Sequence, residues 1–548
     1  MSQPWIHERS ILEQLVTLRA EVLKEATDLL EGWRPHIRKV SYHYSAFNAA
    51  CYLALRRRDL RPLQKSLVPL GLSSLGRCEG HVLASLDAVI TALAAICHAP
   101  AGSLPERPSL KHFTRANQIL EKHTRLLLPR PATQRRVRIM VTLPVESATD
   151  YRWMRDIINR GVDCVRINCA LNTRKEWLAM IRKVRRAERE TGHHCAVLMD
   201  LCGPRARVEE VRMVDPARRV RRGDRIGFAN KFDLGSQALP LQAICSMPQV
   251  LEQLRPGATV WMNEGRIGTK VVSKNELSLE LEVFQAREKG EKFHADMGLN
   301  FPDSDLQAPP LTPKDLTDLD FICKHADTVG YSFVQEPSDM DILAREIELR
   351  SLLRGKLKPL GVIAKIETER AVRNLPGLIM RGAGRAPFGV MIARGDLAVE
   401  IGYLRIAEIQ EEILWICEAA HVPVIWATQV LETFAKKGLP SRAEITDAAM
   451  SERAECVMLN KGPFIPEVVS ILSEILGRMQ AHQWKKTAAF RALRSWNYLW
   501  HPVGQRRRPA IVQTQIKGGE KRLRSQVRVT TPRRHISPRR LDAQTARS

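Results

Sequence analysis

Three short apolar segments, each followed by a polar side chain, constrain the fold of this chain more than any other feature. They are LGVIAKIE (360–367), the first part of GVMIARGDLAVEI (389–401) and VPVIWAT (422–428). Each pattern is typical of a buried strand that ends beside a charged or hydroxyl group, and helix-patterned sequence separates the three. Parallel strands joined by helices bring their carboxyl ends to one face. The sequence therefore predicts one polar site built from several strand ends.

The same alternation of strand and helix continues through most of the chain. Five further strands are predicted, at 137–144, 162–168, 195–201, 328–334 and 456–460. Eight strands interleaved with helices indicate an α/β fold, a (β/α)8 TIM barrel. The segment 208–299 differs, because its short Val- and Ile-rich runs are punctuated by Gly and Asp. It predicts a small β domain inserted after the third strand.

The first 134 residues predict an α-helical N-terminal extension, because Ile11, Leu15, Leu18 and Val22 recur at helical spacing, as do the apolar residues of 82–96. Arginines lie among the leucines of this extension, and we expect them to form a solvated helix face rather than a partner surface. The predicted domain limits are 1–134 (extension), 135–207 and 300–480 (the two parts of the barrel), 208–299 (insert) and 481–548 (a helix, then a basic disordered tail).

The net charge of +25 suits an anionic substrate. The segment from Ala481 onward contributes strongly, with 17 Lys and Arg against 2 acidic residues. Such a tail could bind RNA, but aromatic residues stop after Trp500, so there is no platform for stacking bases. We therefore favour a solvated tail over nucleic-acid binding.

The cysteines indicate a reducing compartment, since the 11 residues are scattered without a CxxC pair and mostly lie in apolar runs. The first residues are too polar for a signal peptide, and no uninterrupted apolar run reaches the length of a membrane span. We expect a soluble, cytoplasmic protein without membrane contact.

Charged residues at the predicted strand ends suit phosphoryl transfer. Glu367 and Asp396, from adjacent strands, could share one divalent cation that substrate oxygens and water complete. Lys365 lies two residues before Glu367, on the same side of its strand. Arg166 and Arg207 add positive charge that suits phosphate oxygens. Phosphoryl transfer needs positioning and charge neutralisation of this kind, although any one of these residues could instead form a structural ion pair at the barrel rim.

Several motifs closely resemble the pyruvate kinase family: VRINCA (165–170), DLCGPRAR (200–207), SFVQEPSDM (332–340), AKIE (364–367), MIARGDLAVEI (391–401) and PVIWATQVLETFAKKGLPSRAEITDAA (423–449). The resemblance covers about 135–480, with the β insert where the family has its lid domain. It implies Mg²⁺-dependent transfer of a phosphoryl group from phosphoenolpyruvate to ADP, giving pyruvate and ATP. We expect the family's C-terminal regulatory domain to be missing.

The resemblance also implies residue roles. Lys365 would stabilise the transferring phosphoryl group and the enolate, Thr428 would lie at the proton-delivery end, and Arg166 would meet the phosphate. Glu367 and Asp396 would hold Mg²⁺, with Mn²⁺ as a substitute. Gly395 and Asp396 would offer backbone N–H groups to the substrate carboxylate. The substrate-binding set implied in this way is Arg166, Asn168, Arg207, Gly395, Asp396 and Thr428.

One departure from the family pattern concerns potassium. The resemblance places the monovalent cation near Asn168 and Asp200, but Ala170 and Leu201 replace a serine and a threonine that would complete its ligands. Arg205 replaces a glutamate and puts a permanent positive charge near the vacated place. Some family members with a lysine there dispense with potassium, so we expect activity that does not require K⁺.

A second departure concerns the nucleotide side. Leu171 replaces a histidine, and in MLNKGPF (458–464) Asn460 and Gly462 replace a serine and a glutamate. Two alternatives to a pyruvate kinase therefore stay open: a phosphoenolpyruvate or pyruvate enzyme with another phosphoryl acceptor, and a non-catalytic, metabolite-binding regulatory protein. Retention of the lysine, both carboxylates and the threonine argues against the second. We also expect a homo-oligomer.

Overall fold

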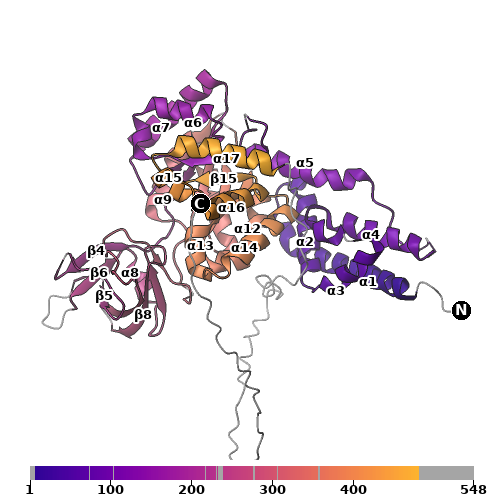
Figure 1. Cartoon of the computed structure of the whole chain (residues 1–548), viewed down its shortest axis with the longest axis horizontal. Helices are drawn as coiled ribbons and strands as arrows, with labels where there is room; N and C mark the ends of the chain where they lie inside the picture. Colours follow the sequence, from indigo (N-terminus) through magenta and orange to yellow (C-terminus); the bar gives the residue numbers. More distant parts are fainter. Residues whose placement is uncertain are drawn as a thin grey trace, which may run out of the picture. The chain divides into compact units, whose positions relative to one another are not determined.

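The computed structural model describes residues 6–480, except for 73, 101, 103, 132, 216, 230, 233–238, 276–277, 305 and 356–357. The predicted basic tail (481–548), and with it the question of nucleic-acid binding, lies outside the described residues. The described elements form an N-terminal group of helices, a barrel and a β insert (Figure 1).

Eight parallel strands close into a barrel in the order β1-β15-β14-β13-β12-β11-β3-β2. This confirms the predicted TIM barrel. The strands are almost entirely buried on both faces, as expected where helices cover a parallel sheet. They are β1 (Arg138–Thr142), β2 (Cys164–Asn168), β3 (Ala196–Asp200), β11 (Thr328–Tyr331), β12 (Gly361–Ile366), β13 (Phe388–Ala393), β14 (Val424–Ala427) and β15 (Cys456–Leu459).

Several barrel helices begin at capped positions that fix where each strand-to-helix loop ends. Thr173, Thr312 and Ser441 each form a reciprocal capping box with the third residue of the helix that follows. The helices are α6 (Tyr151–Asn159), α7 (Arg174–Thr191), α9 (Pro313–His325), α10 (Pro337–Leu349), α11 (Ser351–Arg354), α12 (Glu369–Ala383), α13 (Arg394–Ile401), α14 (Ile406–Ala419), α15 (Glu432–Lys437), α16 (Arg442–Met450) and α17 (Ile465–Met479).

The insert between β3 and the return to the barrel is a curled, seven-stranded sheet with its own hydrophobic core. Its edges approach each other through the bridge between Arg207 and Gly298, beside a hydrogen bond from the Val208 N–H to Met297 O. The elements are β4 (Val208–Met213), β5 (Arg225–Ala229), β6 (Leu241–Cys245), α8 (Pro248–Leu251), β7 (Thr259–Met262), β8 (Ile267–Lys274), β9 (Ser278–Gln285) and β10 (Leu299–Asn300). The predicted β insert is confirmed, whereas its limits stay a prediction.

The N-terminal extension is helical, as predicted, with α1 (Ile6–Trp33), α2 (His43–Arg56), α3 (Arg61–Leu67), α4 (Val82–Ile96) and α5 (Leu110–Leu127). One expectation about its arginines was wrong. Arg56 is fully buried and packs over the ring of Trp415 on the barrel helix α14. Arg57 and Arg58 form ion pairs with Glu25. These three side chains are therefore part of the packing rather than a solvated face.

The extension and the barrel share one continuous hydrophobic core. Polar contacts cross the same junction: Asn48 Nδ2 donates to Ala419 O at 2.8 Å, and Tyr42 Oη donates to Ala420 O at 3.2 Å. His421, at the end of α14, places Nδ1 at 2.9 Å from Ser45 Oγ. Because these buried groups are satisfied across the junction, the extension is a structural part of the barrel.

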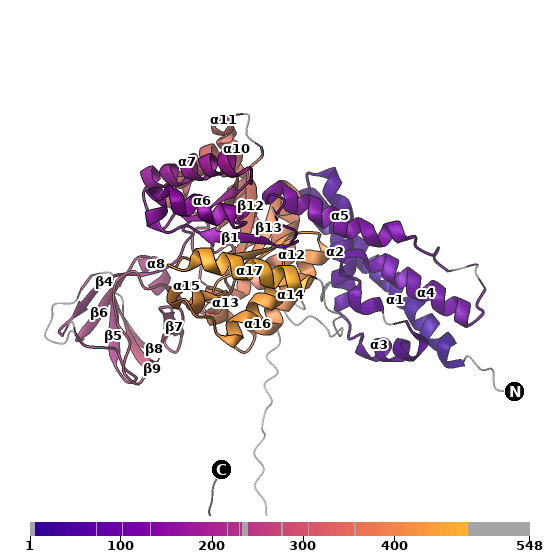
Figure 2. The same ribbon diagram turned by 45° about the horizontal axis from the view of Figure 1, so that its top comes forward.

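The last residues of α5 close the N-terminal end of the barrel, where α5 lies beside β12 and β13 (Figure 2). Leu127 and Leu128 belong to the cluster of side chains that fills the barrel interior. A glycine in the first two residues of each of these strands makes room for Leu127. A Cβ on Gly361 would lie 2.5 Å from a Leu127 methyl group, and one on Gly389 would lie 3.0 Å from the other.

Within the described residues, one helical stretch, 79–96, is long and apolar enough to cross a membrane. It comprises α4 and the 3₁₀ turn before it, and half of it is buried inside the protein. Helix α4 packs against α1 and α2. This is weak evidence for a membrane span, because a core helix meets the same criteria.

Candidate active site

Lys365 lies at the centre of a buried network of charges at the carboxyl end of β12. Its Nζ donates to Ser332 Oγ at 2.7 Å and lies 3.1 Å from Glu367 Oε1 and 3.4 Å from Asp200 Oδ2. Burial alone would lower the pKa of Lys365, but the carboxylates of Asp200 and Glu367 outweigh burial and raise it. The ammonium group therefore stays charged throughout the physiological pH range.

Arg166, on β2, joins this network through Asp200. Its Nε donates to Asp200 Oδ2 at 2.6 Å and its Nη1 donates to Thr142 Oγ1 at 3.2 Å. Burial would raise the pKa of Asp200, but Arg166 and Lys365 outweigh burial and lower it. Asp200 thus stays ionised and holds two cations in place. A Cβ on Gly330 of the next strand would collide with Asp200 Oδ1 at 1.8 Å, so this approach requires a glycine.

The two predicted metal ligands, Glu367 and Asp396, interact electrostatically with each other. Glu367 follows β12 and accepts a hydrogen bond from the Phe333 N–H at 2.6 Å, whereas Asp396 lies in the first turn of α13. Burial raises the pKa of Glu367, and the nearby Asp396 raises it further against the opposing effect of Lys365. Two mutually repelling carboxylates are an arrangement that a bound cation would stabilise.

Asp396 already has a cationic partner in this structure. Arg205 Nη2 donates to Asp396 Oδ1 at 2.5 Å, and Asn300 Nδ2 lies 3.4 Å from the same oxygen. Within the described part of the chain, both hydrogen bonds that Asp396 accepts through its side chain end on Oδ1. Its second carboxylate oxygen thus takes no part in either bond.

Thr428, directly after β14, is held in a strained conformation. Its φ of 63° is unusual for a β-branched residue. Thr428 Oγ1 accepts a hydrogen bond from the Gly395 N–H at 2.8 Å. The Gly395 N–H, which we expected to face the substrate carboxylate, therefore contacts Thr428 in this structure.

The remaining sequence-predicted residues are less closely tied to the network. Asn168 Oδ1 accepts from the Ala170 N–H at 3.0 Å, within its own loop. Arg207 Nη1 donates to Asp296 O at 3.2 Å, at the edge of the insert. The hydrogen bonds and ion pairs of the described residues tie Asp200 to Arg166 and Lys365, and tie Arg205 to Asp396. Arg205 thus lies at the predicted metal ligand rather than in contact with the potassium-site residues.

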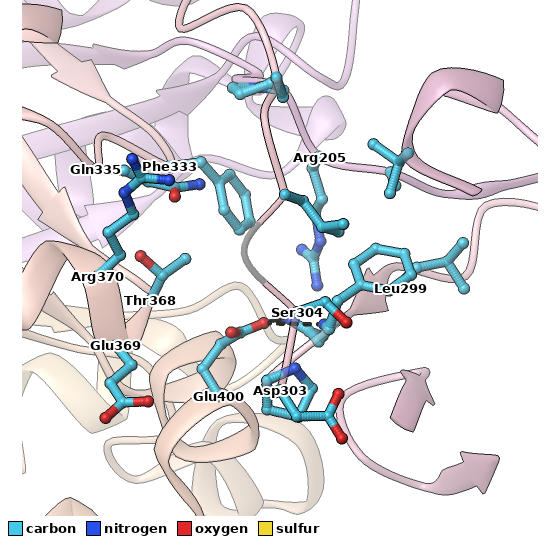
Figure 3. A pocket seen from close by; sticks show the side chains of 18 of the residues that line it. Arg205, Leu299, Asp303, Ser304, Phe333, Gln335, Thr368, Glu369, Arg370 and Glu400 are labelled. Carbon is cyan, nitrogen blue, oxygen red and sulfur yellow. Dashed lines mark hydrogen bonds between the residues drawn. The ribbon is translucent and has the colours of Figure 1, made fainter. Parts of the chain in front are cut away.

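A cavity of about 630 Å³ opens beside this network and was not anticipated from the sequence (Figure 3). Its polar lining includes Arg205, Asn300, Asp303 and Glu400. Glu400 Oε1 accepts from Asn300 Nδ2 at 3.1 Å. Burial raises the pKa of Glu400 to about 7, although these hydrogen bonds oppose the shift. Glu400 was missed because it lies within α13, beyond the predicted strand end; its place in VEI, four residues after Asp396, was the available signal.

The carboxylates present fit a hard divalent cation held by few protein ligands. Among the described residues, no group of three or more His, Cys, Asp or Glu side chains could hold a metal ion by itself. Glu367 and Asp396 supply oxygen ligands, and substrate oxygens and water would have to complete the coordination, as Mg²⁺ commonly requires.

The comparison with known families decides the classification. The family model described as "Pyruvate kinase, barrel domain" matches residues 134–463, more than half of the 548 residues. The chain belongs to the pyruvate kinase family. This confirms the predicted family. It also confirms the prediction that the protein is an enzyme, a kinase among the transferases. Pyruvate kinases generally use Mg²⁺.

Individual pyruvate kinases resemble the chain at low identity. One from Agrobacterium vitis is 32% identical over 359 residues, which are 64% of this chain and 69% of the relative. One from Thermococcus litoralis is 28% identical over 350 residues, covering 63% and 69%. The crystal structure of a pyruvate kinase from Cryptosporidium parvum superposes with a TM-score of 0.56 at 23% identity, covering 64% of this chain and 70% of that one. This last likeness supports the fold alone.

On the side of the site where the resemblance placed the nucleotide, the residues that depart from the family's sequence pattern lie on loops. Leu171 is 46% exposed. A Cβ on Gly462 would lie 2.2 Å from Ala435 O, so the loop after β15 packs tightly on α15 where the resemblance leads one to expect a glutamate. Asn460 Oδ1 accepts from the neighbouring Lys461 N–H. This pyruvate kinase homologue thus has a charged network around Lys365 and, beside it, a loop after β15 that packs tightly against α15.

Proposed function

We propose that this protein transfers the phosphoryl group of phosphoenolpyruvate to ADP, with Mg²⁺ and without a requirement for K⁺. The observation that carries the proposal is the buried Lys365, held by Asp200, Glu367 and Ser332 at the strand ends of a pyruvate kinase barrel. A fixed ammonium group in a buried site that excludes water stabilises charge that develops during the reaction. Lys365 would face the transferring phosphoryl oxygens and the enolate oxygen left behind.

Arg166 would bind the phosphate of phosphoenolpyruvate before transfer. Its guanidinium is fixed by Asp200 and Thr142, so little side-chain entropy is lost when an anion binds. Arg207 could add charge from the edge of the insert, and Asn168 would support the loop beside Arg166. The binding energy of these groups positions the phosphoryl group between the two substrates.

Glu367 and Asp396 would hold the Mg²⁺, which when bound neutralises charge on phosphoryl oxygens. Lys365, which lies 3.1 Å from Glu367, would add its own positive charge beside the same carboxylate.

Thr428 would complete the reaction by directing a proton to the enolate carbon. Its Oγ1 accepts from the Gly395 N–H, so the hydroxyl proton remains available for donation to another group. The left-handed backbone at Thr428 fixes this orientation. Asp396 and Gly395, in the first turn of α13, would place the substrate carboxylate near the helix N-terminus.

Independence from K⁺ follows in this proposal from a permanent cation beside the site. Arg205 supplies positive charge at the cavity edge beside Asp396 and Glu400, while Leu201 and Ala170 offer no side-chain ligand. The test is the rate of pyruvate formation from phosphoenolpyruvate and ADP with Mg²⁺, in K⁺ and in tetramethylammonium at equal ionic strength. We expect equal rates in the two salts. Strong stimulation by K⁺ would refute the independence, and absence of turnover in both would refute the proposed reaction.

The loop after β15, whose sequence departs from the family pattern, favours one alternative. This alternative is a phosphoenolpyruvate enzyme with a different phosphoryl acceptor. Gly462 leaves no space for a larger side chain, and Leu171 presents an apolar surface where a histidine was expected. Pyruvate formed with another nucleoside diphosphate or with water, but not with ADP, would support this alternative. The expected homo-oligomeric state and cytoplasmic location remain part of the proposal.

A further inference from the structure

Arg205 is bound to a residue that the proposed function assigns to the metal. Its ion pair with Asp396 is 2.5 Å long, and the two side chains are only 19% and 14% exposed. Arg205 Nε is buried and has no hydrogen-bond partner among the described residues. The guanidinium is therefore held chiefly through one nitrogen, Nη2, and by packing.

The Arg205 guanidinium lies beside Gly298 and the Phe333 ring, and the space that these two residues border is called the slot. A Cβ on Gly298 would lie 2.5 Å from Arg205 Nη2, and the Phe333 ring lies 5.6 Å from the guanidinium carbon. Among the described residues the guanidinium donates one hydrogen bond, to Asp396, so leaving Asp396 breaks no other hydrogen bond.

The slot opens into the 630 Å³ cavity, and a second acid is close to the first. Figure 3 shows Arg205 directed into the cavity that Glu400 also lines. Asn300 Nδ2 lies 3.4 Å from Asp396 Oδ1 and 3.1 Å from Glu400 Oε1, so one amide group bridges the two carboxylates. Glu400 thus lines the same cavity as Arg205, one amide group away from the carboxylate that Arg205 contacts.

We propose that Arg205 is a displaceable internal cation. It neutralises Asp396 when no divalent cation is bound, and it moves to Glu400 in the cavity when a divalent cation takes Asp396. This inference rests on the proposed function, since it takes Glu367 and Asp396 as the metal ligands. Arg205 then lowers the affinity for the metal, and Glu400 offsets part of that loss by accepting the displaced guanidinium.

The first experiment measures Mn²⁺ binding to the full chain without substrates, from the loss of the free Mn²⁺ signal in electron paramagnetic resonance. Arg205→Gln should bind Mn²⁺ at least about fivefold more tightly than the wild type, the scale of a typical coupling between two sites. Arg373→Gln is the matched control, because Arg373 lines the same cavity but pairs with Glu369 rather than with Asp396. We expect its affinity to stay close to that of the wild type.

The second experiment is a double-mutant cycle with Glu400→Gln, which separates displacement from a simple change of local charge. In the wild-type background, Glu400→Gln should weaken Mn²⁺ binding several-fold, because Arg205 loses its alternative partner. In the Arg205→Gln background it should have no effect. An equal effect in both backgrounds, or equal affinities of wild type and Arg205→Gln, would overturn the displacement.

These outcomes are distinguishable from failure of the proposed function. If neither the wild type nor any variant binds Mn²⁺ at millimolar concentration while circular dichroism shows a folded chain, the carboxylates are not a metal site and both proposals fall. If Mn²⁺ binds as expected but no pyruvate forms, the displacement stands and the assigned reaction fails.

Discussion

The two ends of the same barrel strands have opposite chemistry. Strand β12 starts at Gly361, packed beneath the apolar Leu127, and at its other end carries Lys365 and leads into Glu367, in a buried network of charges. Gly389, the second residue of strand β13, also lies against Leu127, and this strand leads into Asp396. One end is closed by a helix of the extension, and the other carries the candidate site.

This difference separates stability from activity along one strand. In TIM barrels, residues at the carboxyl ends of strands serve chemistry, and residues at the amino ends serve the fold. The N-terminal extension lies outside the family match at 134–463. In the described residues it packs at the amino ends of the strands and so serves the fold. Changes at the two ends should therefore move different observables.

The largest expected effect is on turnover, from Lys365→Met. Loss of a charge that acts mainly on the transition state should lower kcat for pyruvate formation by about three orders of magnitude. The measurement is steady-state kinetics with phosphoenolpyruvate and ADP, beside circular dichroism to establish folding.

Arg138→Met is the control for this variant at the other end of the barrel. Arg138 is also a buried cation, on β1, and pairs with Glu121 of α5. Its loss should lower stability while turnover per folded molecule stays near that of the wild type. Near-normal kcat in Lys365→Met would remove Lys365 from the mechanism.

Leu127→Ala should have the next largest effect, on stability alone. Leu127 is 4% exposed and fills the N-terminal end of the barrel interior. Removing it should lower the free energy of unfolding by about 2–5 kcal/mol. Urea unfolding measures this, with Leu126→Ala as control, since Leu126 is 53% exposed on the same helix and should change stability by less than about 0.5 kcal/mol. A large fall in kcat/KM of folded Leu127→Ala would contradict the separation of stability and activity between the two ends of the strands.

A smaller effect should appear in the pH dependence of stability. The pKa of Glu400 is raised to about 7 by burial, with Asp396 and Glu369 adding to the shift. The folded chain then keeps a proton that the unfolded chain releases above its ordinary pKa of about 4.5, so this stabilisation is lost as pH rises through 7. Between pH 5 and 8, the free energy of unfolding of the wild type should fall by up to about 3 kcal/mol more than that of Glu400→Gln. Parallel stability curves for the two proteins would contradict this assignment.

The sequence predicted the fold well because its signals are local and periodic. Apolar runs of strand length alternate with helix patterns, and polar residues follow the runs, so the meeting of Arg166, Asp200, Lys365 and Glu367 could be expected from topology. The roles of these residues remain predictions, since contact in the folded chain does not by itself establish chemistry.

The contacts that were missed depend on packing between distant segments. The burial of Arg56 against Trp415, the position of Leu127 in the barrel and the pairing of Arg205 with Asp396 join residues far apart in sequence. Nothing in the local pattern of any of these residues specifies its partner. Arg205 in particular was expected beside the vacated potassium ligands, but its ion pair lies at Asp396, the predicted metal ligand.

The most direct test of the central claim is to follow ³¹P by nuclear magnetic resonance in a mixture of protein, phosphoenolpyruvate, ADP and Mg²⁺. We expect the phosphoenolpyruvate signal to fall while the γ-phosphate signal of ATP rises by an equal amount, and Lys365→Met to show neither change over the same period. Phosphoenolpyruvate that persists with the folded wild type, or phosphorus that appears in a product other than ATP, would contradict the account.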